Sequence, residues 1–195
     1  MSTDTRIYVN SGIKFDPLSP RPALIQLTDV AQGLSNVCRF SGQCSPFYSV
    51  AQHSLLVCAL LANVDSRLFQ TRVGQLVALF HDAAEAYLGD VPTPLKRHPA
   101  WAAYREYENQ MLEVIEQKYI LDEGFSRDEV EYARESVKRA DTLAFVFEAR
   151  FFFGLDFTNM LMPGETLPDR DEFSPWSPSM SKRRWLEHHA AVLYK

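Results

Sequence analysis

The sequence predicts an all-α protein, a helical bundle that forms one domain over residues 1–195. Beyond residue 27, apolar residues recur every three or four positions, which is the spacing of helices with one buried face. Glycine and proline residues, such as those at 89–94, divide this pattern into segments of helical length. A chain of this length fits a single domain with its own hydrophobic core.

The first 27 residues are expected to form a small β-hairpin followed by a loop. Residues 7–9 and 13–15 flank an Asn-Ser-Gly sequence that is typical of a turn. Three prolines between residues 17 and 22 then prevent regular structure. The first helix is expected to have Thr28 as its N-cap and to end near residue 37.

Two helices are expected over residues 49–63 and 71–88. In the first of them, His53 lies four positions before Val57 and therefore shares its apolar face. Gly89 is expected to end the second helix in the left-handed conformation, and the two prolines that follow forbid its continuation.

Two longer helices are expected over residues 100–119 and 126–153. The second begins with Ser126 and has a glutamate three positions later, which is the pattern of a capping box. Residues 156–178 are rich in Pro, Asp and Gly and are expected to form a surface loop. A last amphipathic helix is expected over residues 179–194.

The composition is that of an ordinary globular protein with a net charge of −5. This charge argues against a nucleic-acid polymer as partner and favours a small anionic ligand that is held locally. The N-terminal residues lack a basic stretch followed by an apolar run, so no signal peptide is expected, and no apolar run is long enough to span a membrane. The three cysteines have no CxxC spacing and are expected to be reduced thiols of a cytoplasmic protein.

Residues that can bind a metal ion fall on the apolar faces of three expected helices. His81 and Asp82 are adjacent, and Glu85 lies four positions after His81 on the same face. His53 and Asp141 lie on the inward faces of two other helices. A buried carboxylate is costly unless it is paired or bound to a metal ion. Two imidazoles and two carboxylates suit one divalent ion of Mn, Fe, Co, Ni or Zn, and suit Mg less well.

The spacing alone leaves another interpretation open. A His-Asp dipeptide is common by chance, and His53 taken alone fits a hydrogen-bonded histidine of the core. The metal site is favoured only because three helices each place such a group on an apolar face.

The sequence resembles the HD phosphohydrolase superfamily, and in particular its small bacterial and phage members that act on deoxynucleotides. The likeness covers most of residues 7–155, and the run at 80–96 is its most specific part. The matching segments are 36–40 (NVCRF), 48–56 (YSVAQHSLL), 80–96 (FHDAAEAYLGDVPTPLK) and 137–141 (VKRAD). The resemblance implies an HD-domain fold over the whole chain and a location inside a bacterial or phage-infected cell.

The resemblance also implies a role for each matching residue of the metal site. The implied ligands are His53, His81, Asp82 and Asp141. Glu85 would be the acid/base residue beside a metal-bound water molecule. The histidines that two-metal members use in addition have no match here, so one metal ion is expected.

Further matching residues would contact the substrate. Asp90 matches an acidic residue near the sugar and the reacting phosphate, although it could also simply cap the turn that follows it. Arg39 matches an arginine that holds phosphate, and Phe40 stands where deoxynucleotidase relatives often carry tryptophan. Lys96 and Lys138 could hold additional phosphates, or could be solvated charges on their helices.

Two activities fit this resemblance, and both break the bond beside the sugar. The first expectation is a triphosphohydrolase of the dATP type, which releases a deoxynucleoside and tripolyphosphate, because lysines downstream of the metal helix suit a long phosphate chain. The alternative is a 5′-deoxynucleotidase, which removes phosphate from deoxynucleoside monophosphates, since its members carry similar lysines. A non-catalytic nucleotide sensor is an alternative from another class. A homo-oligomer is expected, because compact members of the superfamily commonly assemble.

Overall fold

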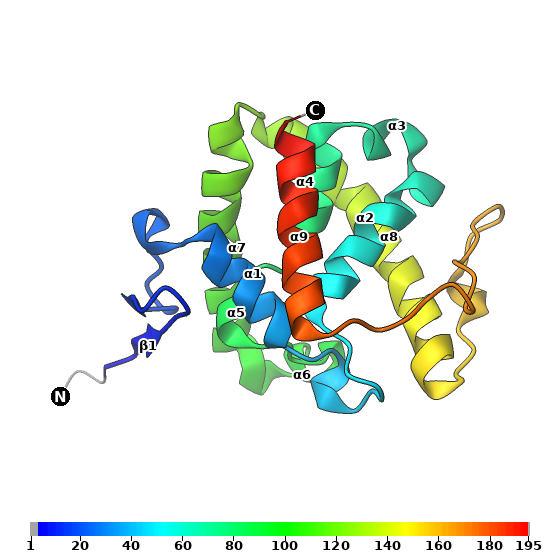
Figure 1. Ribbon diagram of the computed structural model, residues 1–195, viewed down its shortest axis with the longest axis horizontal. Coiled ribbons are helices and arrows are strands. Elements are labelled where there is room, and N and C mark those ends of the chain that lie inside the picture. The colour runs from blue at the N-terminus through cyan, green and yellow to red at the C-terminus, as the bar shows by residue number, and fades with distance from the viewer. Residues whose placement is uncertain (1–3, 195) are drawn as a thin grey trace.

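The computed structural model describes residues 4–194, and its helices gather into one bundle with a small β-hairpin at one end (Figure 1). Residues 1–3 and 195, at the ends of the predicted domain, lie outside the described residues. The element order confirms the predicted all-α class with an N-terminal hairpin. Short 3-10 helices occupy Pro22–Leu24, Phe40–Gly42, Pro99–Trp101, Leu121–Glu123 and Thr158–Met160.

The N-terminal hairpin forms as predicted. Its strands β1 (Ile7–Tyr8) and β2 (Lys14–Phe15) pair antiparallel, with Ile7 opposite Phe15. The Phe15 side chain is buried, and its ring packs against the ring of Tyr87 at a centroid distance of 4.8 Å. Phe15 therefore attaches the hairpin to the helical core, together with the partly buried Val9 and Ile13.

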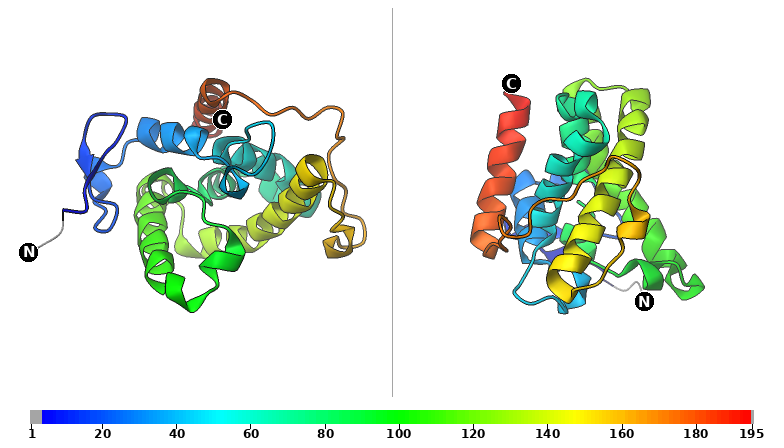
Figure 2. Two further views of the ribbon diagram at one scale, coloured as in Figure 1. Left: turned by 90° about the horizontal axis from the view of Figure 1, so that it is seen from below. Right: turned by 90° about the vertical axis from the view of Figure 1, so that its right-hand side faces the viewer.

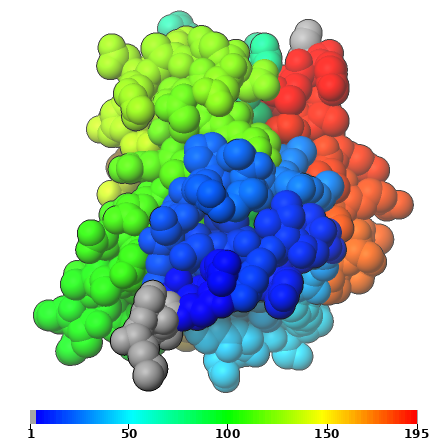
Figure 3. Space-filling model, turned by 90° about the vertical axis from the view of Figure 1, so that its left-hand side faces the viewer, coloured from blue at the N-terminus to red at the C-terminus, as the bar shows by residue number. Residues whose placement is uncertain are grey.

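The segment after the hairpin lies along α7 (Ala102–Tyr119). The Lys118 ammonium group donates hydrogen bonds to the carbonyl oxygens of Pro22 and Ile25, at 2.8 and 2.6 Å. Figure 3 shows this segment in blue, covering one face of the molecule between the green α7 and the red α9 (Pro178–Leu193).

Three helices form the centre of the bundle and pack against one another: α2 (Val50–Val64), α4 (Arg72–Phe80) and α8 (Arg127–Phe153) (Figure 2). The hydroxyl groups of Ser49 and Thr71 cap α2 and α4 by accepting a hydrogen bond from a backbone amide of the first turn. The predicted boundaries of α2 are therefore correct to within a residue or two.

The long helix α8 begins and ends as predicted. Ser126 and Glu129 form the capping box, in which each side chain accepts from the other residue's backbone N–H. Gly154 ends the helix in the left-handed conformation, with φ of 67° and ψ of 18°. The 27 residues between these caps carry one edge of the candidate site.

The predicted continuous helix over 71–88 is wrong. Helix α4 ends at Phe80, four residues form tight turns, and a separate short helix α5 (Glu85–Leu88) follows. In the turns the amides bond to the carbonyl three residues back, as from Ala83 to Phe80, instead of four. The apolar pattern could not show this break, because side chains three and four positions apart lie on the same side in both geometries. Gly89 adopts the expected positive φ of 80°, but its ψ of 160° lies outside the left-handed helical region.

Helix α1 (Leu27–Asn36) starts earlier than predicted. Its N-cap is Gln26, which makes no side-chain capping bond, so the prediction of Thr28 as N-cap is wrong. The helix packs closely on α5: a Cβ atom on Gly33 would lie 2.4 Å from the carbonyl oxygen of Ala86. Glycine is required there, because any larger residue would separate the two helices.

The remaining elements are short helices and the C-terminal helix. The predicted loop over residues 156–178 is present, but α9 begins at Pro178, one residue earlier than expected, with Ser177 as its N-cap. The additional short helices are α3 (Ser66–Phe69) and α6 (Thr93–Lys96). Within residues 4–194, none of the helices combines the length and the apolarity needed to cross a bilayer.

Candidate active site

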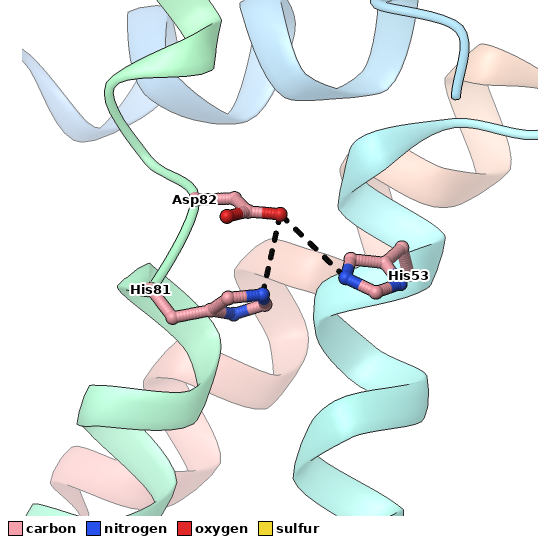
Figure 4. A group of neighbouring side chains, drawn as sticks. All are labelled: His53, His81 and Asp82. Atoms are coloured by element: carbon pink, nitrogen blue, oxygen red, sulfur yellow. Dashed lines mark ion pairs between the residues drawn. The ribbon is translucent and has the colours of Figure 1, made fainter. Parts of the chain in front are cut away.

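Two histidines and an aspartate meet where α2 faces the end of α4 (Figure 4). His53 lies on α2, His81 is the C-cap residue directly after α4, and Asp82 is the next residue of the turn that follows. Asp82 Oδ2 lies 3.2 Å from His81 Nε2 and 3.5 Å from His53 Nε2. The three ligand atoms lie within 4.8 Å of one another. The tight turn after Phe80 brings the carboxylate between the two rings.

Asp141, the fourth predicted ligand, borders this cluster from α8. Its Oδ1 atom lies 3.1 Å from His53 Nε2, and 41% of its side chain is exposed. His53, by contrast, has no exposed surface. The cluster is therefore closed on the α2 side and open to solvent on the side of Asp141.

The two imidazole rings present the same nitrogen to the centre of the cluster. His53 Nδ1 lies 2.6 Å from a Glu148 oxygen, and His81 Nδ1 lies 2.7 Å from the Ala78 carbonyl oxygen. These acceptors favour a proton on Nδ1 and leave Nε2 as the nitrogen that faces the cluster. Both Nε2 atoms are buried and make no hydrogen bond. Paired imidazole and carboxylate donors of this kind fit a divalent transition metal ion.

The charge around the cluster also suits a cation. Burial would lower the pKa of His81, but Asp82 and Asp141 outweigh burial and raise this pKa to about 9. In the same way, His81, His53 and Arg39 outweigh the burial of Asp82 and hold its pKa below the usual range. The cluster therefore has a strong negative field at the position where the two Nε2 atoms point.

Glu85 lies beside the cluster in a buried position, with only 3% of its surface exposed. Its Oε1 atom accepts a hydrogen bond from Lys96 Nζ at 3.1 Å, while Oε2 is buried without a partner. Burial, followed by the charges of Asp82 and Asp90, raises the pKa of Glu85 well above its usual value. A carboxyl group of raised pKa with one unpaired oxygen is suited to exchange a proton with a ligand.

The predicted substrate residues Arg39, Phe40 and Asp90 lie on a third side of the cluster. Arg39 Nη1 is 3.5 Å from Asp82 Oδ2. The Phe40 backbone N–H donates a hydrogen bond to Asp90 at 3.2 Å, so Asp90 holds the loop that carries Arg39. The Phe40 ring packs edge-on against Phe153 at 5.1 Å, which ties this loop to the end of α8.

The two predicted lysines have different surroundings. Lys96 is held between Glu85 and Glu108, with its Nζ 2.5 Å from a Glu108 oxygen. Lys138 is exposed at the rim of a cavity of about 260 Å³ that also borders His81 and Asp141. The other cavity walls are mostly apolar: Val77, Phe80, Leu112, Ile120 and Val137, with Glu116 and Arg134.

Two buried or half-buried carboxylates of the site were missed by sequence reasoning. Glu148 is fully buried and contacts His53, and Glu108 contacts Lys96. Glu148 carried a usable signal, because it is the single acid in an otherwise apolar run and lies two helical turns after Asp141. Glu108 carried none, since it is one of several glutamates on α7.

Comparison with known proteins gives a consistent result. A family model described as 5′-deoxynucleotidase YfbR-like matches residues 32–150. The uncharacterized protein YfdR of Escherichia coli K12 is 34% identical over 165 residues, which are 84% of this chain and 82% of that protein. An uncharacterized protein of Rhodobacter capsulatus is 34% identical over 146 residues, 74% of this chain and 71% of that protein. The 5′-deoxynucleotidase ECA3034 of Pectobacterium atrosepticum is 34% identical over 114 residues, but these cover 49% of this chain and 56% of that enzyme.

The helical bundle and its histidine and aspartate cluster define a phosphohydrolase of the HD class. Within this class, the chain belongs to the YfbR-like 5′-deoxynucleotidase family, whose model matches more than half of it. It is therefore an enzyme, a deoxynucleotide phosphohydrolase. Membership of an enzyme family argues against the non-catalytic nucleotide sensor.

Proposed function

We propose that this protein is a metal-dependent 5′-deoxynucleotidase, which hydrolyses deoxynucleoside monophosphates to a deoxynucleoside and phosphate. The observation that carries the proposal is the cluster of the buried His53 with the partly buried His81 and Asp82, with the unpaired oxygen of Glu85 beside it. The names of the deoxynucleotidase relatives support this activity over the triphosphohydrolase that the lysines first suggested.

The charges around the site also favour a monophosphate. Arg39 is paired with Glu148 and Asp82, and Lys96 is paired with Glu85 and Glu108. A triphosphate needs several cations to balance its charge, but two of the three predicted cations are already neutralised by carboxylates. The third predicted cation, Lys138, is exposed at the cavity rim, where the neighbouring Arg134 is itself paired with Glu116.

We assign the roles as follows. His53, His81, Asp82 and Asp141 hold one divalent ion. When bound, such an ion polarises a phosphoryl oxygen and lowers the pKa of a water molecule. Glu85 is the acid/base residue that would exchange a proton with such a water molecule.

The substrate is oriented by groups on both sides of this cluster. Arg39 directs its guanidinium group toward the phosphate, with the fork geometry that suits phosphoryl oxygens. Asp90 keeps the Arg39 loop in place through its bond to the Phe40 amide. The apolar cavity beside His81 and Asp141 takes the uncharged part of the substrate.

Product analysis tests the proposal. Metal-stripped protein is incubated with dAMP or dATP, with Mn, Co, Zn or Mg added singly, and every product is identified by chromatography. We expect phosphate and deoxyadenosine from dAMP, with dATP cleaved far more slowly. Tripolyphosphate from dATP at a rate well above that of dAMP turnover would contradict the proposal.

Two variants control for contaminating activity. Asp82→Asn should abolish turnover, while His98→Gln, at an exposed histidine away from the cluster, should leave it unchanged. The native metal, a homo-oligomeric state and a cytoplasmic location remain predictions that accompany this proposal.

A further inference from the structure

Glu148 is a fully buried carboxylate that contacts both halves of the candidate site. Its Oε1 atom lies 2.6 Å from His53 Nδ1 and accepts a hydrogen bond from the Tyr48 hydroxyl at 2.8 Å. Its Oε2 atom accepts a hydrogen bond from Arg39 Nη2 at 3.1 Å. The side chain has no exposed surface. One carboxylate thus connects a residue of the metal cluster to the arginine that faces the phosphate.

The position of Glu148 is explained by these contacts. A buried carboxylate is strongly destabilising unless charges and hydrogen bonds compensate it, and here a guanidinium group, an imidazole and a hydroxyl do so. Their donors converge from three separate parts of the chain: the loop at Arg39, the residues around Tyr48 that precede α2, and α2 itself. A structural ion pair would need only the arginine, and would not require the carboxylate to contact a histidine of the cluster.

We propose that Glu148 is a positioning residue that couples metal binding to phosphate binding. Through Oε1 it holds the His53 ring with Nε2 aimed at the metal position, and through Oε2 it holds Arg39 toward the substrate phosphate. The inference rests on the roles proposed above for His53 and Arg39. It implies that the metal ion and the phosphate each bind more tightly when the other is present, because both require the same carboxylate in one place.

The first test measures metal affinity. Mn²⁺ or Co²⁺ is titrated calorimetrically into the full metal-stripped chain, for wild type and for Glu148→Gln. A residue that orients a metal-binding histidine typically contributes 10–100-fold to the affinity, so we expect the Kd of the variant to rise by about that factor. The visible spectrum of the Co²⁺ protein should also change, because the His53 ring is no longer fixed.

The second test measures the coupling between Glu148 and Arg39 in phosphate binding. Inorganic phosphate is titrated into the metal-loaded protein for wild type, Arg39→Lys, Glu148→Gln and the double variant. We expect each single variant to weaken phosphate binding, and the double variant to weaken it by much less than the product of the two effects, since Arg39 is already misplaced without Glu148.

Matched variants separate positioning from folding. Tyr48→Phe removes one hydrogen bond from Glu148 but keeps its contacts with His53 and Arg39, and should change either affinity less than about threefold. If Glu148→Gln fails to fold, Glu148→Asp keeps the charge but is too short to reach both partners, so at least one of the two affinities must fall. Wild-type affinities in the folded variant, with only a lower melting temperature, would overturn the inference.

The outcomes also separate this inference from the proposed function. A protein that binds metal and phosphate with the expected coupling but does not cleave dAMP would leave the inference standing and reject the substrate. A protein that cleaves dAMP, and keeps its metal and phosphate affinities in Glu148→Gln, would reject the inference alone.

Discussion

Glu85 is held by a single lysine, and its second oxygen is buried without a partner. A carboxylate is rarely left in this state in a protein interior, because an unsatisfied buried oxygen is destabilising. The arrangement is understandable if a ligand or a water molecule completes the hydrogen bonds of Oε2 during turnover.

Replacement of Glu85 by glutamine should therefore affect turnover and leave metal binding intact. The amide has the same shape but cannot exchange a proton, so we expect kcat on dAMP to fall by about 10²–10⁴-fold. Steady-state kinetics with a calorimetric metal titration provide the measurement. A variant that keeps more than a tenth of the wild-type kcat would show that Glu85 is not the proton-transferring group.

Sequence reasoning works well for residues whose partners lie nearby on a helix face. The adjacent His81 and Asp82, and the buried position of His53, could be read from the apolar pattern. The burial of Glu148 could have been read in the same way, but its partner could not, because the contact with His53 joins residues 95 positions apart. The pairing of Lys96 with Glu108 was missed for a similar reason, since it depends on how α6 meets α7.

At the scale of elements, α9 attaches to the bundle through a row of aromatic rings. The His189 ring stacks on Trp185 at 6.2 Å and meets the Phe80 ring edge-on at 5.7 Å. His189 is buried, and its Nε2 atom makes no hydrogen bond. This histidine therefore packs as a neutral aromatic ring and has no part in the site.

The packing of His189 predicts a pH dependence of stability. Burial lowers the pKa of His189, so the unfolded chain takes up the proton first as the pH falls below the unperturbed value of about 6.5. Above that pH, His189 is neutral in both states and does not change the free energy of unfolding. Below that pH, the free energy of unfolding falls progressively. We expect urea midpoints measured from pH 8 to pH 5 to fall more steeply for wild type than for His189→Gln. Parallel curves for the two proteins would show that His189 has the same pKa in the folded and unfolded states, which would contradict the prediction.

Helix boundaries could be predicted where a capping residue marks them. They could not be predicted where the backbone hydrogen bonds change from four-residue to three-residue spacing. Ser49, Thr71 and Gly154 mark ends that the structure confirms. The break between α4 and α5 has no comparable marker, because it lies inside an apolar stripe. That stripe is continuous in the sequence, although the helix is not.

At the scale of the whole molecule, the predicted metal ligands come from three elements that meet only in the folded chain. His53 is on α2, the His81 and Asp82 pair follows α4, and Asp141 is on α8. An unfolded chain keeps these groups apart and would bind a metal ion weakly. Metal binding should therefore stabilise the folded state.

Addition of Mn²⁺ or Co²⁺ to the stripped protein should raise its melting temperature, and a chelator should reverse the change. At a free metal concentration of 100 times Kd the stabilisation is about 2.7 kcal/mol. Thermal unfolding followed by circular dichroism provides the measurement, with Asp82→Asn as the control that should respond weakly. An equal shift in both proteins would place the stabilising metal ion elsewhere.

The fold class and most helices could be predicted because they depend on apolar spacing within each segment. The packing of these segments against one another could not be predicted from the sequence. This packing determines the surroundings of Lys96 and Glu148. The close approach of α1 to α5 at Gly33 is one such case. Nothing near Gly33 in the sequence indicates that Ala86 will lie against it.

Helix α8 carries both Asp141 and Glu148, which lie seven residues apart. Two turns of a rigid helix fix their separation along the axis at about 10.5 Å. The helix therefore holds the two carboxylates at a fixed spacing. Asp141 borders the open side of the site, and Glu148 lies on its buried side. A shift of α8 as a unit would move both carboxylates together, whereas an inserted or deleted residue between them would rotate one away by about 100°. This stretch of the chain should accordingly tolerate no change in length, and few substitutions, because four of the six residues between Asp141 and Glu148 are buried.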